Sequence, residues 1–527
     1  MKTIVKIRVP SIIAGLIFIC AILPIRAGDF SAQDRDYDAY IDANQLLMTY
    51  SNVGMISHAG GDIFPAGIGG LYYPYTTTED IENGITHSLI YSSGIWLGGK
   101  VSGETRVALA EFSSDFWPGP MINGTFDSTA DADHIYRVYK LYSDSLASNP
   151  NQDYLDWPVD QGAPINAIGG PVCLGDQTLW SVYNDANPDG NPFRARFSAP
   201  LGIEVRQTTW ASDLPGEENA VYMEYCLFNK GANMIGDLHL SIWLDPDLGD
   251  FADDLVGCDT ADDTYYCYNA TNNDTQYPGN PPAVGYKLIA GPVVSSPGDS
   301  ALYFRGYVQD YRNLRMSSFY KYIGGLDPQD ADWAYNFMRG YEQDGSLPAN
   351  GSVFQVTGDP VIPSGELDSN PGNRMMLGSF GPFDFNPGDS QYVLVKLAVG
   401  RDTDRLTAIT EMRSILNGPF DFPVDVADEA EAIVPHAYTL AQNIPNPFNS
   451  GTSISYSLPE KSHVTIRIFN ILGQEVKTVV DEFRNAGEYS VRWDGRNNSG
   501  RSVSTGLYLY RIEAGDYSGT RKMLFLK

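Results

Sequence analysis

The sequence predicts a mainly β, multidomain protein, in which a β-sandwich-like body with a few helices precedes a C-terminal β-sandwich. The first observation is length, because 527 residues exceed what one hydrophobic core usually holds. The second is the stretch from residue 53 to about 400, where short apolar and aromatic runs alternate with Gly, Pro, Asn and Asp clusters. The third is composition, since 33 Tyr, 52 Gly and 33 Pro suit many short strands joined by turns.

Five runs illustrate the predicted strands of the body. In residues 220–228 both faces of an extended chain are largely apolar, which predicts a strand covered on both sides. The runs are "HSLIYSSGIWLGGKV" (87–101), "AVYMEYCLFNKG" (220–231), "DLHLSIWLD" (237–245), "ALYFRGYVQD" (301–310) and "SQYVLVKLAVG" (390–400).

Helices are predicted at three places. Residues 330–341 place three aromatic side chains four apart on one face, and residues 402–418 carry one apolar stripe. The second of these opens on Asp and Thr cap candidates and ends at Asn417-Gly418. Near the start, residues 29–54 read as an exposed lead-in followed by one short helix.

The charge is strongly negative and unevenly spread. The net charge of −30 argues against nucleic acid as a partner, because a phosphate backbone attracts Lys and Arg. From Pro435 to Lys527, however, 11 Lys and Arg stand against 8 Asp and Glu. This step indicates a domain boundary near residue 435, and the acidic, Pro-containing segment 419–442 reads as a linker. We expect the body to comprise two β-rich units, 28–200 and 201–418, the second with an acidic loop and helices.

The first residues read as a secretory signal peptide, 1–27. Lys2, Lys6 and Arg8 precede the apolar run "IIAGLIFICAIL" (12–23), which is too short to span a bilayer. No later transmembrane run is found. We therefore expect a mature chain without a transmembrane helix, secreted or held at the outer cell surface.

The last 85 residues, 443–527, show the alternation and turns of a small sandwich. Apolar residues alternate with polar ones in 464–469, 489–494 and 508–512, between turns such as "LGQE" and "DGRNNSGRSV". About seven short strands in this length are typical of an all-β sandwich.

This tail resembles the type A C-terminal sorting domain of the type IX secretion system, a module related to the FlgD Ig-like fold. The resemblance rests on "PNPFN" (445–449), "YSLPE" (456–460), "VTIRIFNILGQEV" (464–476), "AGEYSVRWDGRN" (486–497), "SGRSVSTGLYLYRI" (499–512) and "TRKMLFLK" (520–527). It implies an Ig-like sandwich, export through the inner membrane by the signal peptide, and outer-membrane translocation by the type IX machinery. It also implies either release of the body or its attachment to surface lipopolysaccharide. An ordinary Ig-like accessory domain without a sorting role is the alternative.

The body resembles, more loosely, the large uncharacterised bodies of other exported bacterial proteins. The stretches "SSGIWLGGKV", "LGIEV" (201–205) and "DPDLGD" (245–250) carry this resemblance. It implies no activity.

An Asp-rich segment, 243–267, is the strongest candidate for a metal site. Ten Asp and no Lys or Arg lie between Lys230 and Lys287. Crowded carboxylates repel one another unless they are solvated or bridged, and Ca²⁺ takes six to eight oxygen ligands from such loops. A solvated acidic loop is the alternative. The predicted ligands are Asp245, Asp247, Asp250, Asp253, Asp254 and Asp259.

A weaker metal candidate is "NDANPDGNPFRAR" (184–196). Asp185, Asn187 and Asp189 match the first half of an EF-hand loop, but Arg196 occupies the position where a bidentate Glu is required. An ordinary Asn/Asp/Gly turn is the alternative.

Four cysteines follow the predicted signal peptide, and an even number in an exported chain permits disulfides. Cys258 and Cys267 flank a short Asp-rich loop and are the preferred pair. The alternative is four buried free thiols, because a chain of this size needs no covalent crosslinks.

Signatures of enzymes are scarce. The six His are scattered, and the chain holds no HExxH, GxSxG or P-loop pattern. Large aromatics such as Trp96, Trp243, Trp333 and Tyr72-Tyr73 could stack on sugars but are more often part of a core. We expect a non-catalytic surface or secreted protein, adhesive or structural, with Ca²⁺ as its cofactor and an extracellular glycan or protein as partner. The alternative is a secreted hydrolase acting on a polymer such as polysaccharide.

Overall fold

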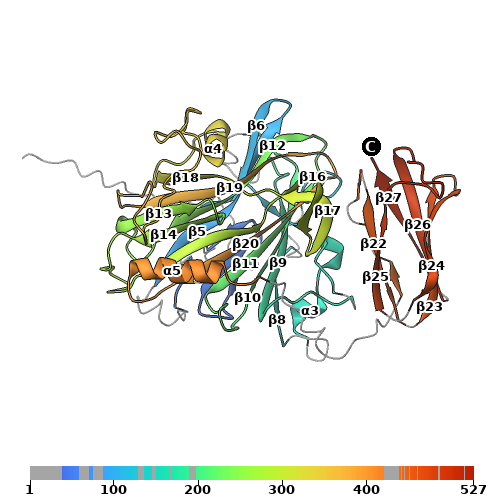
Figure 1. Ribbon diagram of the computed structural model, residues 1–527, viewed down its shortest axis with the longest axis horizontal. Coiled ribbons are helices and arrows are strands. Elements are labelled where there is room, and N and C mark those ends of the chain that lie inside the picture. Colours follow the sequence, from blue (N-terminus) through green and yellow to red (C-terminus); the bar gives the residue numbers. More distant parts are fainter. Residues whose placement is uncertain are drawn as a thin grey trace, which may run out of the picture. The chain divides into compact units, whose positions relative to one another are not determined.

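The body is built from two large antiparallel sheets, and a computed structural model of the chain shows how they pack (Figure 1). It describes residues 38–57, 70–74, 87–128, 136–144, 150–166, 169–188, 198–420, 438–440, 442–443, 446–449, 451–459, 461–484, 487–515 and 517–526. The predicted signal peptide, Asp189 and most of the predicted linker lie outside these residues.

The first nine-stranded sheet has the order β1-β2-β3-β5-β12-β19-β18, with β4 and β6 paired beside this path. Its strands are β1 (Asp38–Ile41), β2 (Leu47–Ser51), β3 (Met55–Ile56), β4 (Leu71–Tyr72), β5 (Ser88–Val101), β6 (Glu104–Leu109), β12 (Ile235–Pro246), β18 (Met316–Ile323) and β19 (Arg374–Phe385).

The second nine-stranded sheet has the order β13-β14-β15-β20-β11-β10-β9-β7, with β8 paired to β9. Its strands are β7 (Trp117–Pro118), β8 (Tyr139–Tyr142), β9 (Gln177–Asn184), β10 (Ile203–Ala211), β11 (Ala220–Asn229), β13 (Asp254–Asp259), β14 (Thr264–Asn269), β15 (Ala283–Ala290) and β20 (Ser390–Gly400).

One hydrophobic core joins the two sheets. Alternate residues of each strand point inward, so Ile242 of β12 and Tyr225 of β11 belong to the same buried cluster. This cluster extends from Ile41 to Val399 in the sequence. The expected division of the body into units 28–200 and 201–418 is therefore wrong, because both halves of the chain supply strands to each sheet.

The outer faces of both sheets are also covered, which explains why their strands are apolar on both sides. Helix α4 (Ala331–Met338) packs on the outer face of the first sheet (Figure 1). Helix α5 (Arg405–Leu416) and the β16–β17 hairpin (Val293–Tyr303 and Gly306–Asn313) pack on the outer face of the second sheet. Strand β11 confirms the prediction of two-sided burial, since nine of its ten residues are buried. A short helix α3 (Gln152–Leu155) and the 3-10 turns η1 (Val159–Gln161) and η3 (Phe251–Asp253) complete the body.

Both long helices lie where the sequence predicts them. Helix α5 begins with a capping box, in which the Asp404 side chain accepts from the Thr407 backbone N–H and the Thr407 hydroxyl accepts from the Asp404 N–H. It ends at Asn417, as expected. The short helix predicted within 29–54 is not found in its described part, because 47–51 form a fully buried strand paired on both sides.

The run 301–310 is a hairpin rather than one strand, and its turn carries a buried ion pair. Phe304 and Arg305 both have positive φ, 48° and 63°, a conformation that costs side-chain-bearing residues about 1 kcal/mol or more each. The Arg305 guanidinium donates to both carboxylate oxygens of Glu224 on β11, at 2.8 and 2.7 Å. The hydroxyl of Tyr392 on β20 donates to the same carboxylate at 3.1 Å. This ion pair fixes the hairpin to the second sheet.

The C-terminal module is a sandwich of seven strands with its own core, as predicted (Figure 1). Three strands form one sheet, β21-β22-β25, and four form the other, β24-β23-β26-β27. They are β21 (Thr439–Leu440), β22 (Thr452–Leu458), β23 (Ser462–Asn470), β24 (Glu475–Arg484), β25 (Gly487–Trp493), β26 (Gly506–Ala514) and β27 (Tyr517–Phe525).

Because the Glu224 carboxylate is buried, we expect the protein to lose much of its folding stability when Arg305 is removed. Arg305→Met leaves a buried carboxylate without its cation, so the free energy of unfolding should fall by about 3–5 kcal/mol. Chemical denaturation measures this. The control is Arg315→Met, which removes an ion pair with Asp263 and hydrogen bonds to the Thr260 and Ala261 carbonyl groups on the surface, and which should cost less than Arg305→Met. Equal losses in the two variants would contradict the role of the buried pair.

Candidate functional site

The six predicted calcium ligands fall on different elements around the ends of β12 and β13. Asp245 lies next to the last residue of β12, Asp250 caps the η3 turn, Asp253 ends that turn, and Asp254 begins β13. Asp259 lies at the other end of β13. Within the described residues, no three His, Cys, Asp or Glu side chains lie close enough together to hold a metal ion. The part of the chain that the structure describes therefore does not gather three of the predicted ligands, and calcium binding stays a prediction.

Three of these carboxylates accept hydrogen bonds from backbone amides. Asp254 accepts from the N–H of Leu248 at 3.3 Å. Asp250 accepts from the N–H of Ala252 at 3.0 Å and caps the η3 turn, and Asp259 accepts from the N–H of Ala261 at 2.9 Å. The Asp250 and Asp259 contacts span two residues, as Asp side chains do in turns. This spacing in the sequence could have indicated the structural role.

Asp274, which the sequence analysis did not select, fastens the segment. Its carboxylate accepts from the backbone N–H groups of Asp250, Gln276 and Tyr277 at 2.7–2.8 Å, and from the Asn269 side chain at 3.3 Å. Asp274 is 3% exposed, so these bonds satisfy a buried carboxylate. Hydrogen bonds from backbone N–H groups to Asp carboxylates thus hold the acidic stretch in its conformation.

Three carboxyl groups of the segment are shielded from water, and this raises their pKa values. Burial, with the neighbouring carboxylates of Asp247 and Asp327, raises the pKa of Asp245 to about 8. Burial raises the pKa of Asp247 to about 6 and that of Asp254 well above its usual range. The Oδ1 atoms of Asp245 and Asp254 have no hydrogen-bond partner among the described residues. Burial and these neighbours thus favour the protonated form of Asp245.

The weaker metal candidate is also a structural turn in its described part. Asp185 is fully buried and accepts from three successive backbone N–H groups, those of residues 201–203, at 2.5–2.8 Å. Asn187 is 5% exposed, and Asp189 lies outside the described residues. Asp185 thus fixes the start of β10.

The predicted Cys258–Cys267 disulfide is wrong. Cys258 lies opposite Tyr265 and Cys267 opposite Val256 in the β13–β14 pairing, so the two thiols do not face each other. Both are free and buried, as are the remaining two described cysteines, Cys173 and Cys226.

Most of the aromatic candidates belong to the core. Trp96 and Trp243 are fully buried and stack on each other, with ring centroids 6.2 Å apart. Tyr72 is buried and Tyr73 half-buried. Trp333, in contrast, is half-buried and lines a cavity of about 500 Å³ beside α4.

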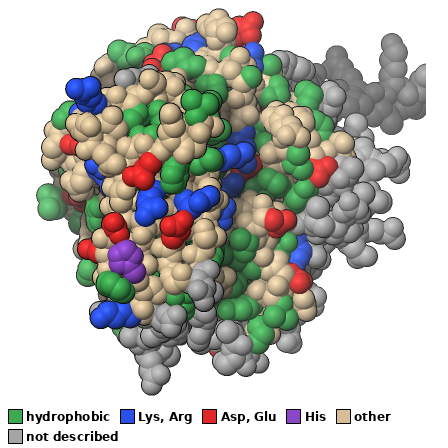
Figure 2. Space-filling model, turned by 90° about the vertical axis from the view of Figure 1, so that its right-hand side faces the viewer, with side chains coloured by type: hydrophobic (Ala, Val, Ile, Leu, Met, Phe, Trp, Pro, Cys, Tyr) green, Lys and Arg blue, Asp and Glu red, His purple; other side chains and the backbone are tan. Residues whose placement is uncertain are grey.

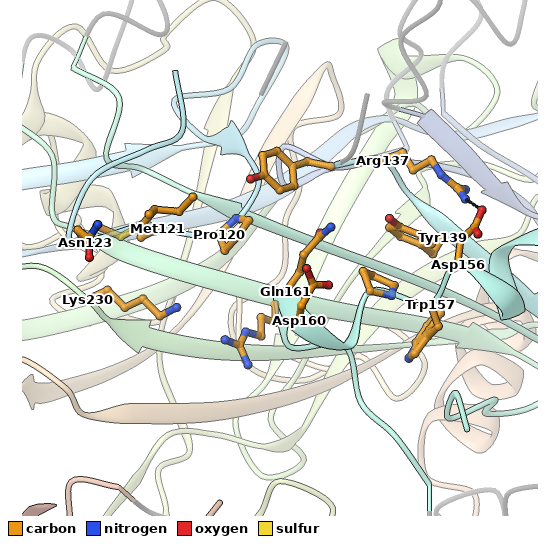
Figure 3. A pocket seen from close by; sticks show the side chains of 14 residues that line it. Pro120, Met121, Asn123, Arg137, Tyr139, Asp156, Trp157, Asp160, Gln161 and Lys230 are labelled. Atoms are coloured by element: carbon orange, nitrogen blue, oxygen red, sulfur yellow. Dashed lines mark ion pairs between the residues drawn. The ribbon is translucent and has the colours of Figure 1, made fainter. Parts of the chain in front are cut away.

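A groove of about 770 Å³ opens on the second sheet (Figure 3). Its volume is within the 300–1,000 Å³ that is usual for ligand sites. The groove is bordered by the α3–η1 segment, by residues 120–123 and 136–137, by Arg206 of β10 and by Lys230, which follows β11. The groove is lined by Pro120, Met121, Ile122, Asn123, Tyr136, Arg137, Tyr139, Asp156, Trp157, Pro158, Asp160, Gln161, Arg206 and Lys230.

A buried carboxylate orients two cations at one end of the groove. Glu204 is fully buried and accepts from Arg206 at 3.0 Å and from Lys230 at 2.6 Å. It also accepts from the backbone N–H of Met121 at 2.8 Å. The Arg206 guanidinium lies 4.4 Å from the centre of the Phe228 ring, which fixes its plane.

The other end combines a third cation with aromatic rings. Arg137 forms an ion pair with Asp153 and lies 3.6 Å from Asp156, and its guanidinium stands 4.3 Å over the Tyr139 ring. Trp157 meets Tyr139 edge-on at 6.1 Å. Figure 3 shows Asp160 and Gln161 between the two ends.

Sequence reasoning did not find this groove. The spacing of Glu204 and Arg206 places both on one face of a strand, which was a local signal. Arg137 and Lys230, however, are brought to the same groove only by the fold.

Charge is mixed elsewhere on the surface. On the face shown in Figure 2, Lys and Arg side chains lie beside Asp and Glu, with apolar side chains scattered between them. That face offers nucleic acid no continuous basic area. None of the described helices is both long and apolar enough to cross a membrane.

Comparison with known proteins identifies the C-terminal module. Residues 442–518 match the FlgD Ig-like domain family. The match covers the module and none of the body, and no curated protein matches the chain.

Solved structures resemble the chain only weakly. A polysaccharide lyase is 8% identical over 86% of this chain and 44% of its own, with a TM-score of 0.24. Dimeric latent PorU from Porphyromonas gingivalis is 11% identical over 66% of this chain and 31% of its own, with a TM-score of 0.16. PorZ, a surface component of the type IX secretion system of the same bacterium, is 8% identical over 93% of this chain and 75% of its own, with a TM-score of 0.14. The chain thus spans less than half of the first two structures, and TM-scores this low carry no argument about fold or function.

The buried Asp245 predicts that the protein loses stability as pH rises. A carboxyl group with a raised pKa binds its proton more tightly in the folded state, so the free energy of unfolding falls between about pH 4 and pH 8. Asp245→Asn should remove about 2 kcal/mol of the fall between pH 5 and pH 7. Chemical denaturation across this range measures it, with the exposed Asp299→Asn as control.

Identical pH profiles for Asp245→Asn and the native chain would contradict this assignment. The same experiment with millimolar Ca²⁺ tests the calcium hypothesis. A calcium-dependent gain that disappears in Asp245→Asn would show that the carboxylates share a cation rather than a proton.

Proposed function

We propose that the chain is cargo of the type IX secretion system, and that its FlgD Ig-like module is the sorting domain by which it leaves the cell. The observation that carries this proposal is a C-terminal sandwich with its own core, in which the motifs that resemble sorting domains occupy structural positions. The body is then a non-catalytic protein of the cell surface or medium, adhesive or structural in role.

The first motif of the module is fastened to the last strand. Phe448 of "PNPFN" is 3% exposed and packs on the rings of Trp493 and Phe525, at centroid distances of 5.5 and 5.0 Å. Its backbone N–H donates to Leu524 and its carbonyl accepts from Leu526, at 3.0 and 2.8 Å. The two ends of the module are therefore closed on each other, so removal of either would open its core.

The "NILGQE" turn between β23 and β24 serves no such packing role. Ile471 and Leu472 are 70% and 77% exposed. The turn is nevertheless ordered, because the Asn470 side chain accepts from the backbone N–H groups of Leu472 and Gln474 at 3.0 Å. Two exposed apolar side chains on an ordered turn suit a contact with a partner protein, and we assign that contact to the secretion machinery.

Removal of the module should stop export. In a bacterium with a type IX secretion system, a chain that ends at Pro435 should accumulate in the periplasm, while the full chain reaches the surface or medium. The double variant Ile471→Ser/Leu472→Ser should export less than a tenth as much as the full chain, although its module still folds. Cell fractionation with immunoblotting measures both.

The matched control is Ile362→Ser, which removes an apolar side chain of the body that is 73% exposed. It should be exported normally. Normal export of the truncated chain would remove the sorting role. Normal export of the double variant alone would move the recognition surface elsewhere on the module.

A further inference from the structure

The groove of Figure 3 presents hydrogen-bonding groups of almost balanced charge. Three cationic side chains line the groove. Four carboxylates either line it too or form ion pairs with these cations. The cations are Arg137, Arg206 and Lys230, and the carboxylates are Asp153, Asp156, Asp160 and Glu204. Near-cancellation of charge favours neither a polyanion nor a cation as ligand. A neutral, polar ligand fits better.

Arg206 and Lys230 are oriented before any ligand arrives, and Asp160 offers acceptors that no other group among the described residues occupies. Glu204 holds Arg206 and Lys230, yet the Lys230 side chain remains 32% exposed and has further donors to offer. Asp160 is exposed and has no hydrogen bond or ion pair among the described residues, so both of its oxygens can accept. Donors that are fixed in advance, as Arg206 and Lys230 are, lose little conformational entropy on binding.

The groove also has an apolar side. Ile122 and the half-buried Pro120 line one end, whereas Met121, Tyr139 and Trp157 also border the groove but are buried. Ile122 is 45% exposed, although apolar side chains of this size are usually buried. A ligand that suits these walls needs an apolar face and an edge rich in hydroxyl groups.

Sugar rings have this combination, since their C–H face is apolar and their rim carries hydroxyls that both donate and accept. We propose that the groove binds a neutral oligosaccharide, whose hydroxyl groups bind Asp160, Gln161 and Lys230 and one of whose ring faces lies on Pro120 and Ile122. This site goes beyond the export proposal, and either can fail without the other. It gives the body a glycan as its adhesive ligand.

Isothermal titration calorimetry on the purified full chain tests this with cellohexaose, xylohexaose, mannohexaose and chitohexaose, and with hexagalacturonate as the anionic counterpart. At least one neutral hexasaccharide should bind with a Kd below about 1 mM. Asp160→Ala should weaken binding about tenfold or more, because a hydrogen bond to a charged group is lost.

The control Asp213→Ala removes an exposed carboxylate that does not line the groove, and it should leave the Kd unchanged. A thermal melt of each variant confirms that it is folded. Failure of all four neutral hexasaccharides to bind would overturn the proposal. So would binding of hexagalacturonate alone, or an equal effect of the two variants.

Discussion

The packing of two nine-stranded sheets through one hydrophobic core is the constraint on which the rest of the body depends. Each sheet contains strands from both halves of the chain, so neither half can bury its apolar surface alone. Burial of apolar area contributes about 25 cal/mol per Å², and the inner and outer faces both contribute here. The helices, the hairpin and the groove are placed by this shared core.

Charged groups stabilise the points where irregular segments meet the sheets. Glu224 holds the β16–β17 hairpin, and Glu204 holds the base of the groove. Asp368, which is 5% exposed, binds Arg374 and Lys321 at 3.0 and 2.9 Å. A buried carboxylate without its cation is costly, so each pair ties a segment to one position on its sheet. In the same way, the buried Glu204 carboxylate orients Arg206 and Lys230 in the groove.

The sequence allowed the fold class, both long helices and the C-terminal sandwich to be predicted, because each depends on local periodicity and capping. Asp404 and Asn417 mark the ends of α5 in the sequence as clearly as in the structure. The division at residue 200 failed for a different reason. Pairings such as β5 with β12 join residues about 150 positions apart, and no local pattern shows them.

The candidate sites were harder to predict, since proximity in sequence was taken for proximity in space. The Asp-rich segment supplied six carboxylates, but the fold distributes them among caps and buried positions. Cys258 and Cys267 lie on the two strands of one hairpin, but the strand register does not place them opposite each other. The groove shows the converse, because Arg137 and Lys230 meet there from distant parts of the chain.

Limited proteolysis of the mature chain, followed by native size-exclusion chromatography and mass spectrometry, tests whether both halves of the body share one core. With a shared core, we expect early cleavage within the acidic segment 419–442 and release of the C-terminal module, while the body elutes as one particle even where its loops are cut. Two folded fragments that separate on either side of residue 200 would contradict the shared core.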